Sequence, residues 1–242
     1  MTNILVIDSS TEACSVALSH SGLVYAEQKI APRKHAELIL PMVDHVLSQA
    51  QLELTQLDAI GCCIGPGAFT GLRIAISMVQ GLALASNLDC IGITSLEALA
   101  YEAFATTKAD YCLASIDARM QQVYFAVYER GNGQSIKIVT EPQVIDPDLI
   151  EIERHIIDAL QGRVVKVGNG WDYVYRQSID QLTEPSMDIQ LPQAKYMLNL
   201  AQQALQNAKG VSPEQLQPLY LRNNVAKSKS RLHHIYTAPY CT

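Results

Sequence analysis

The chain has 242 residues, of which 48% are hydrophobic and 6% aromatic, and its formal net charge is −6. This length gives one large domain or two small ones with a substantial core. Because phosphate binding needs a basic face, the acidic balance excludes a nucleic-acid grip over the whole molecule, although a local basic patch stays compatible with it.

The cysteines and the N-terminal segment point to an intracellular protein. Six cysteines lie mostly within apolar runs and form no CxxC pair, as buried reduced thiols of a cytosolic protein do. Residues 1–8 lack the basic and long apolar regions of a signal peptide. No run of about twenty purely apolar residues occurs. We therefore predict a cytoplasmic protein without membrane contact.

The first hundred residues predict a sheet that begins with an antiparallel meander. Strands are expected at 4–7, 14–18 and 23–30, with the first strand innermost. A helix is expected over 34–50, and Pro41 predicts either a kink or a later start. A buried strand at 58–64 follows, then another strand at 90–93 and a helix that Ser95 could cap.

The stretch from Ile64 to Ser86 predicts a strand, a tight glycine turn and a helix. Gly65, Pro66 and Gly67 interrupt regular structure, and Thr70 could cap a helix over 71–86.

That helix carries apolar residues on two opposite sides. One side has Leu72, Ile76, Val79 and Ala83, and the other has Ile74, Met78, Leu82 and Ala85. A helix that packs on one core needs an apolar arc of roughly 100°, and this arc is about twice as wide. Either the second side binds another protein, or the whole helix is buried within its own domain; the pattern fits both.

The second half of the chain repeats the organisation of the first. Strands are expected at 110–117, 122–128 and 136–141, then a helix at 148–160, a strand at 163–167 and a helix at 194–208. Ile116-Asp117 occupies the place of Ile7-Asp8 at the end of the first strand. We interpret the chain as an α/β protein with two βββαβα halves, residues 1–106 and 107–242.

Four residues are candidates for an anion or nucleotide contact. Asp8 and Asp117 end inner strands, where open sheets place ligands, but each could equally accept hydrogen bonds from its own turn. Gly65 and Gly67 could present N–H groups to an anion, or they could serve a tight crossover. Arg119 could contact a phosphate or pair with a neighbouring carboxylate.

The sequence offers no self-sufficient catalytic constellation. The six histidines include no His-x-x-x-His pair, and neither a Gly-x-Ser-x-Gly elbow nor a phosphate-loop signature occurs. We therefore predict no metal site and no catalytic residue. The basic stretch 227–234 is typical of a solvated end, and an electrostatic contact with RNA is the alternative.

Several motifs resemble the bacterial TsaB (YeaZ) family from the first strand nearly to the C-terminus. They are residues 7–18, 40–43, 65–74, 80–83, 116–120 and 218–226, and the run Phe69-Thr-Gly-Leu-Arg73 is the most specific. The resemblance implies two ribonuclease-H-like halves of the actin-like ATPase fold. It also implies a role in making threonylcarbamoyladenosine at the adenosine 3′ of the anticodon in tRNAs.

The resemblance further implies a division of labour between subunits. The paralogue TsaD would carry the chemistry, this chain would be its non-catalytic scaffold, and the ATPase TsaE would join them. ATP would be used by the assembled complex, a nucleotide could bind at the subunit junction, and tRNA would bind through the complex. The alternatives are a phosphotransferase or ATPase of the same fold and a metallopeptidase.

The heterodimer contact of the family, which a homodimer can mimic, is made by the two helices at 34–50 and 71–86. The partner-binding residues expected from this resemblance are Ile39, Met42, Val43, Val46, Leu72, Ala75, Ile76, Met78, Val79 and Leu82.

Overall fold

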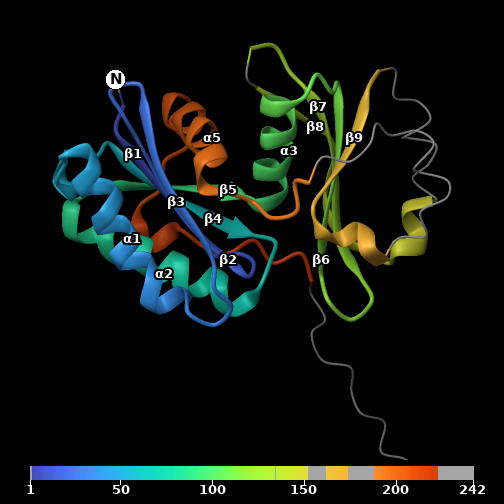
Figure 1. Cartoon of the computed structure of the whole chain (residues 1–242), viewed down its shortest axis with the longest axis horizontal. Coiled ribbons are helices and arrows are strands. Elements are labelled where there is room, and N and C mark those ends of the chain that lie inside the picture. The colour runs from blue at the N-terminus through green and yellow to red at the C-terminus, as the bar shows by residue number, and fades with distance from the viewer. Residues whose placement is uncertain (1, 134, 152–161, 174–187, 223–242) are drawn as a thin grey trace, which may run out of the picture.

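The computed structural model describes residues 2–133, 135–151, 162–173 and 188–222, and shows two lobes, each built on its own sheet (Figure 1). The predicted basic stretch 227–234 and most of the predicted helix 148–160 lie outside these residues. The described part of that helix is a short 3-10 turn, η2 (Pro147–Glu151).

The first sheet has five strands in the order β3-β2-β1-β4-β5. Their bounds are β1 (Ile4–Asp8), β2 (Ala13–His20), β3 (Leu23–Ile30), β4 (Ala59–Gly65) and β5 (Asp89–Thr94). β1 pairs antiparallel with β2 and parallel with β4, so it lies at the centre of the sheet. The predicted meander with its first strand innermost is confirmed.

The second sheet repeats this arrangement with four described strands in the order β8-β7-β6-β9. Their bounds are β6 (Tyr111–Asp117), β7 (Val123–Arg130), β8 (Ile136–Ile145) and β9 (Val164–Val167). β6 pairs antiparallel with β7 and parallel with β9, just as β1 pairs with β2 and β4. The predicted internal duplication is therefore confirmed in the topology of the two sheets.

Helices cover both faces of the first sheet. The longer helices are α1 (His35–Ala50), α2 (Phe69–Ser86), α3 (Ser95–Thr106) and α5 (Ala194–Gln206). Alternate residues of a strand point to opposite faces. Accordingly, Leu5 and Ile7 of β1 share a core with α1 and α2, while Ile4 and Val6 share another core with α5.

Two helices are exchanged between the sequence halves. α3 precedes residue 107 but packs mainly on the second sheet, where Leu96 and Leu99 join the core of β6, β7 and β9. α5 follows that residue but packs on the first sheet (Figure 1). The strands of the two sheets fall on either side of residue 106, whereas α3 and α5 each pack on the sheet of the other half and lie against each other between the lobes.

Local chemistry at the helix ends differs from the prediction in two places. α1 begins at His35 and continues through Pro41 without interruption. The cap of α3 is Thr94 rather than Ser95, since the Thr94 hydroxyl accepts from the N–H of Glu97 and the Glu97 carboxylate accepts from Thr94.

The five described cysteines are free and buried, as predicted. Burial raises the pKa of the Cys14 thiol to about 12.

Candidate functional site

The start of α2 is held by backbone contacts rather than by a side-chain cap. The N-cap position is Ala68, and the predicted cap Thr70 lies inside the first turn of the helix. The N–H of Ala68 donates to the carbonyl oxygen of Ser10 at 2.7 Å, which fixes the helix start on the turn after β1. The prediction of a Thr70 cap is wrong because the helix begins at Phe69, two residues earlier than predicted, so Thr70 lies in its first turn and not at its N-cap.

α2 has one buried and one partly exposed apolar side. Leu72, Ile76, Val79 and Ala83 are at most 5% exposed and pack in the core of the chain. On the opposite side, Ile74, Met78 and Leu82 are partly buried, and Ala85 is exposed. The two sides deduced from the periodicity are present, and the structure shows which one faces the sheet.

Most of the predicted partner-binding residues belong to the buried side. Eight of them have side chains inside the core of this chain: Ile39, Met42, Val43, Val46, Leu72, Ala75, Ile76 and Val79. Met78 and Leu82 are the two that reach the surface. The set mixed both sides because periodicity defines the sides of a helix but not which side packs on the sheet.

Three further surface residues of the same helices lie outside the predicted set. Leu40 of α1 is 48% exposed, and Leu84 of α2 is 67% exposed. Gly81 of α2 faces open space, because a Cβ built on it would meet no atom within 4 Å. We call Leu40, Met78, Gly81, Leu82 and Leu84 the α1–α2 surface.

α2 also has the length and the hydropathy of a membrane-spanning helix. Among the described residues, it is long and apolar enough to cross a membrane by length and composition alone. In the structure one side of this helix packs on β4 and beside α1 (Figure 1).

Asp8 lies in a closed environment at the end of β1. Its side chain is completely buried, and its Oδ1 accepts from the N–H of Ser10 at 2.8 Å. Burial raises the pKa of the carboxyl group, while the Ser10 and Cys63 side chains and the His35 ring oppose this rise. Three buried atoms here have no hydrogen-bond partner among the described residues: Asp8 Oδ2, Ser10 Oγ and His35 Nε2.

The glycine turn after β4 covers Asp8. A Cβ on Gly67 would collide with the backbone of Ser10, and one on Gly71 would collide with the carbonyl oxygen of Ser9. The Ser9 hydroxyl in turn donates to the carbonyl oxygen of Gly71 at 2.8 Å. These glycines therefore allow the backbone of the turn and of α2 to touch the backbone after β1. This is the tight crossover that was the alternative to an anion site.

Asp117 and Arg119 form the corresponding turn of the second lobe. Asp117 Oδ1 accepts from the N–H of Arg119 at 2.7 Å, and Arg119 Nη1 lies 2.9 Å from Asp117 Oδ2. The Arg119 side chain is 81% exposed. Thus the carboxylate pairing expected as the alternative role of Arg119 is present. Asp8 and Arg119 lie in different lobes, each within its own turn.

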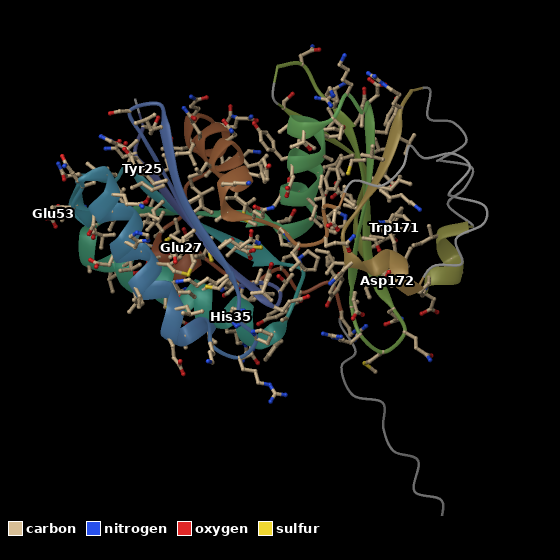
Figure 2. All side chains as sticks on the ribbon, viewed as in Figure 1. Tyr25, Glu27, His35, Glu53, Trp171 and Asp172 are labelled. Carbon is tan, nitrogen blue, oxygen red and sulfur yellow. The ribbon has the colours of Figure 1, made fainter. Side chains whose placement is uncertain are left out.

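The titratable residues labelled in Figure 2 are dispersed rather than gathered. His45 Nδ1 lies 2.9 Å from Glu27 Oε2 on the outside of α1, whereas His35 is buried at the start of that helix. Among the residues that the structure describes, no group of three or more His, Cys, Asp and Glu side chains could hold a metal ion.

Comparisons with known proteins agree with this architecture. A family model described as "TsaD: tRNA N6-adenosine threonylcarbamoyltransferase" matches residues 24–230. The chain is 40% identical to the tRNA threonylcarbamoyladenosine biosynthesis protein TsaB of Escherichia coli K12, over 93% of this chain and 97% of the relative. It is 37% identical to TsaB of Haemophilus influenzae, over 93% and 96% of the two chains.

A solved structure shows the same fold. It is a Pseudomonas aeruginosa protein described as similar to peptidase YEAZ, with a TM-score of 0.83 and 38% identity. The alignment covers 92% of this chain and all of that one. The resemblance noted in the motifs is confirmed over nearly the whole length. The chain belongs to the TsaB family and takes part in the biosynthesis of threonylcarbamoyladenosine in tRNA.

Proposed function

We propose that this chain is a non-catalytic scaffold subunit that binds TsaD through the α1–α2 surface and is required for threonylcarbamoyl transfer to tRNA. The observation that carries the proposal is the apolar side of α2 that its own sheet leaves uncovered, with Met78 and Leu82 next to the open Gly81. Small residues let another helix approach closely, and exposed apolar patches mark protein interfaces.

The neighbouring helix extends this surface. α1 lies beside α2 on the same face of the sheet and contributes the exposed Leu40, while α2 adds Leu84 (Figure 1). A second copy of this chain could occupy the same surface in the absence of TsaD. In this proposal the complex forms in the cytoplasm, and TsaE and tRNA join it.

The enclosed Asp8 turn supports the non-catalytic part of the proposal. The N–H of Ala68 is already bonded to the backbone of Ser10, and the buried Asp8 carboxyl has a raised pKa. An anionic phosphate beside this group would meet a buried carboxyl and a turn whose glycines pack against the backbone of Ser9 and Ser10. We propose that the chain has no cofactor of its own and that ATP is used by the assembled complex, where a nucleotide could bind at the subunit junction.

Substitutions on the α1–α2 surface test the proposal. We expect Met78→Glu and Gly81→Glu to leave the chain folded and to abolish co-purification with TsaD. Gln206→Glu is the matched control, because it adds the same charge at the exposed end of α5, which packs on the opposite face of the sheet. Val79→Glu is unsuitable, since Val79 is completely buried and the change would unfold the lobe.

The function itself is tested by reconstitution of tRNA modification. TsaD, TsaE, ATP, tRNA and an activated threonylcarbamoyl donor should yield modified tRNA with wild-type chain and with Gln206→Glu, and little with Met78→Glu. Modification by this chain without TsaD would overturn the non-catalytic role. Normal TsaD binding by both surface variants would overturn the assigned interface.

A further inference from the structure

A second exposed cluster lies at the end of the first lobe that faces β6 and β7. Three large side chains are about half exposed here: Phe69 is 55% exposed, Met120 is 56% and Tyr220 is 49%. Arg73, Arg119 and Arg222 lie among them. We call these six residues the arginine–aromatic surface. It is distinct from the α1–α2 surface, since it is formed by the first turn of α2, the β6–β7 turn and residues 220–222.

The centre of this surface is a fixed stack. The Arg73 guanidinium lies 3.8 Å from the centroid of the Phe69 ring, and Arg73 Nε donates to the Tyr220 hydroxyl at 3.2 Å. The Phe69 and Tyr220 centroids are 5.9 Å apart. Among the described residues, the terminal nitrogens of Arg73 have no hydrogen bond or ion pair, so a held guanidinium presents unused donors to solvent.

Residues 219–222 join this stack to the second lobe. The N–H of Leu219 donates to the carbonyl oxygen of Ile64 at 2.8 Å, which places the segment against the first lobe. Arg222 Nη2 then donates to Gln122 Oε1 at 2.7 Å and to the carbonyl oxygen of Arg119 at 3.4 Å. Figure 1 shows this red segment passing from one lobe to the other. The surface is therefore continuous across both lobes.

The charge of this surface is opposite to that of the chain. Three arginines lie here beside Asp117, which is paired with Arg119, and Asp146, which accepts from Gln122 Nε2 at 2.9 Å, whereas the chain as a whole carries −6. A guanidinium recognises phosphate by paired hydrogen bonds, and exposed aromatic rings stack with unpaired bases. A single-stranded region of RNA offers both groups together.

We propose that the arginine–aromatic surface binds tRNA directly, with Arg73 and Arg222 on phosphates and Phe69 or Tyr220 on an unpaired base. This inference rests on the proposed function, because the complex must hold a tRNA during transfer. It adds to that function an RNA contact made by this chain itself. A protein partner is the competing occupant, since arginine and aromatic residues are also common in protein interfaces.

Fluorescence anisotropy with a labelled, unmodified tRNA transcript tests the contact on the full chain and on its complex with TsaD. We expect Arg73→Glu to weaken tRNA binding about tenfold or more and to lower the slope of log K against log salt by about one. Lys209→Glu is the matched control, because it makes the same charge change at an exposed site after α5. It should weaken binding by less than about twofold.

The aromatic part of the contact has its own readout. Tyr220→Ala should weaken binding about five- to tenfold without changing the salt slope, because stacking releases no counterions. Tyr220→Phe keeps the ring and loses only the hydroxyl that Arg73 holds, so its effect should be small. Circular dichroism and co-purification with TsaD verify that each variant is folded and assembled.

The outcomes separate the two proposals. The RNA contact would be overturned if Arg73→Glu and Lys209→Glu weakened tRNA binding equally. It would also be overturned if neither Arg73→Glu nor Tyr220→Ala weakened tRNA binding. Loss of TsaD or TsaE binding with unchanged tRNA affinity would assign the surface to a protein instead. Failure of wild-type chain to bind TsaD would refute the scaffold proposal, while the tRNA measurements on the chain alone would still decide this one.

Discussion

Asp8 and Asp117 occupy the same place in two copies of one strand arrangement. Each carboxylate accepts a hydrogen bond from the N–H two residues later, at 2.8 Å for Asp8 and 2.7 Å for Asp117. Their surroundings differ, because Asp8 is completely buried, whereas the Asp117 side chain keeps 11% exposure and is paired with Arg119. The same local turn thus gives a closed structural site in one lobe and an open surface site in the other.

The parallel strand next to each turn explains the difference. β4 is followed by Gly67, and β9 is followed by Gly168 and Gly170; a Cβ on any of the three would collide with the neighbouring inner strand or its turn. In the first lobe the glycine turn leads directly into α2, whose start lies over Asp8. In the second lobe it leads into the short η3 (Asn169–Tyr173), where Asn169 Oδ1 accepts from the N–H of Asp117.

The largest expected effect comes from opening the first-lobe contact. Gly71→Ala places a methyl group against the carbonyl oxygen of Ser9, and we expect it to lower the free energy of unfolding by about 3 kcal/mol. Gly81→Ala is the control in the same helix. It meets open space and should raise that free energy by up to about 1 kcal/mol. Urea denaturation of both variants is the measurement, and equal effects would refute the close backbone contact.

The buried Asp8 carboxyl should make stability depend on pH. Its pKa is raised in the folded state, so its contribution is fully present below the ordinary value and is lost as pH rises through the folded pKa. Asp8→Asn removes this dependence. Between pH 4 and pH 8 we expect it to gain roughly 1 to 3 kcal/mol of unfolding free energy relative to wild type, the scale for an uncompensated buried polar group.

Asp117→Asn serves as the control for this pH series. It keeps the Oδ1 acceptor for the N–H of Arg119 at a site that solvent reaches. Its stability relative to wild type should change by much less over the same pH range. Parallel curves for wild type and Asp8→Asn would show that Asp8 is not coupled to folding.

The joint between α3 and α5 should show a weaker pH dependence. Burial raises the pKa of Glu102 to about 7, opposed by Lys195 and Tyr196, and Gln193 Nε2 donates to its Oε1 at 3.1 Å. The stabilising protonated form is therefore lost between about pH 4.5 and pH 7. Because solvent screens part of the effect, Glu102→Gln should gain only about 1 to 2 kcal/mol across this range. Urea denaturation at several pH values checks this, and a flat difference would contradict it.

The sequence predicted the strands well because period-two runs and turn residues are local signals. Helix ends are predicted less precisely, as the start of α3 shows. Ser95 and Thr94 are adjacent and either can cap a helix, so the predicted cap was one residue away from the observed one. The exchange of α3 and α5 could not be predicted in this way. Each helix is apolar enough to pack on either sheet, and only the chain's path in three dimensions decides between them.

The exposed apolar side of α2 could be predicted at the level of the helix but not of the side chain. The double apolar arc of α2 correctly indicated a second side, and Met78 lies on it. Residues of the buried side were included in the predicted partner-binding set because helical periodicity does not tell which of two apolar sides packs on the core. Gly168 and Gly170 were missed, although the duplication offered the signal: a Gly-x-Gly pair follows the parallel strand in both halves.

The smallest expected effect concerns the open turn of the second lobe. Arg119→Ala removes the ion pair with Asp117 and keeps the backbone hydrogen bond from residue 119 to Asp117 Oδ1. Because the Arg119 side chain is 81% exposed, we expect the free energy of unfolding to fall by at most about 0.5 kcal/mol at low salt. At about 0.5 M salt the dissolved ions screen the pair, and the decrease should be smaller. Urea denaturation at both salt concentrations measures it. A decrease in unfolding free energy as large as that of Gly71→Ala would mean that the turn of the second lobe stabilises the fold as much as the turn of the first. The contrast between the two lobes would then not hold.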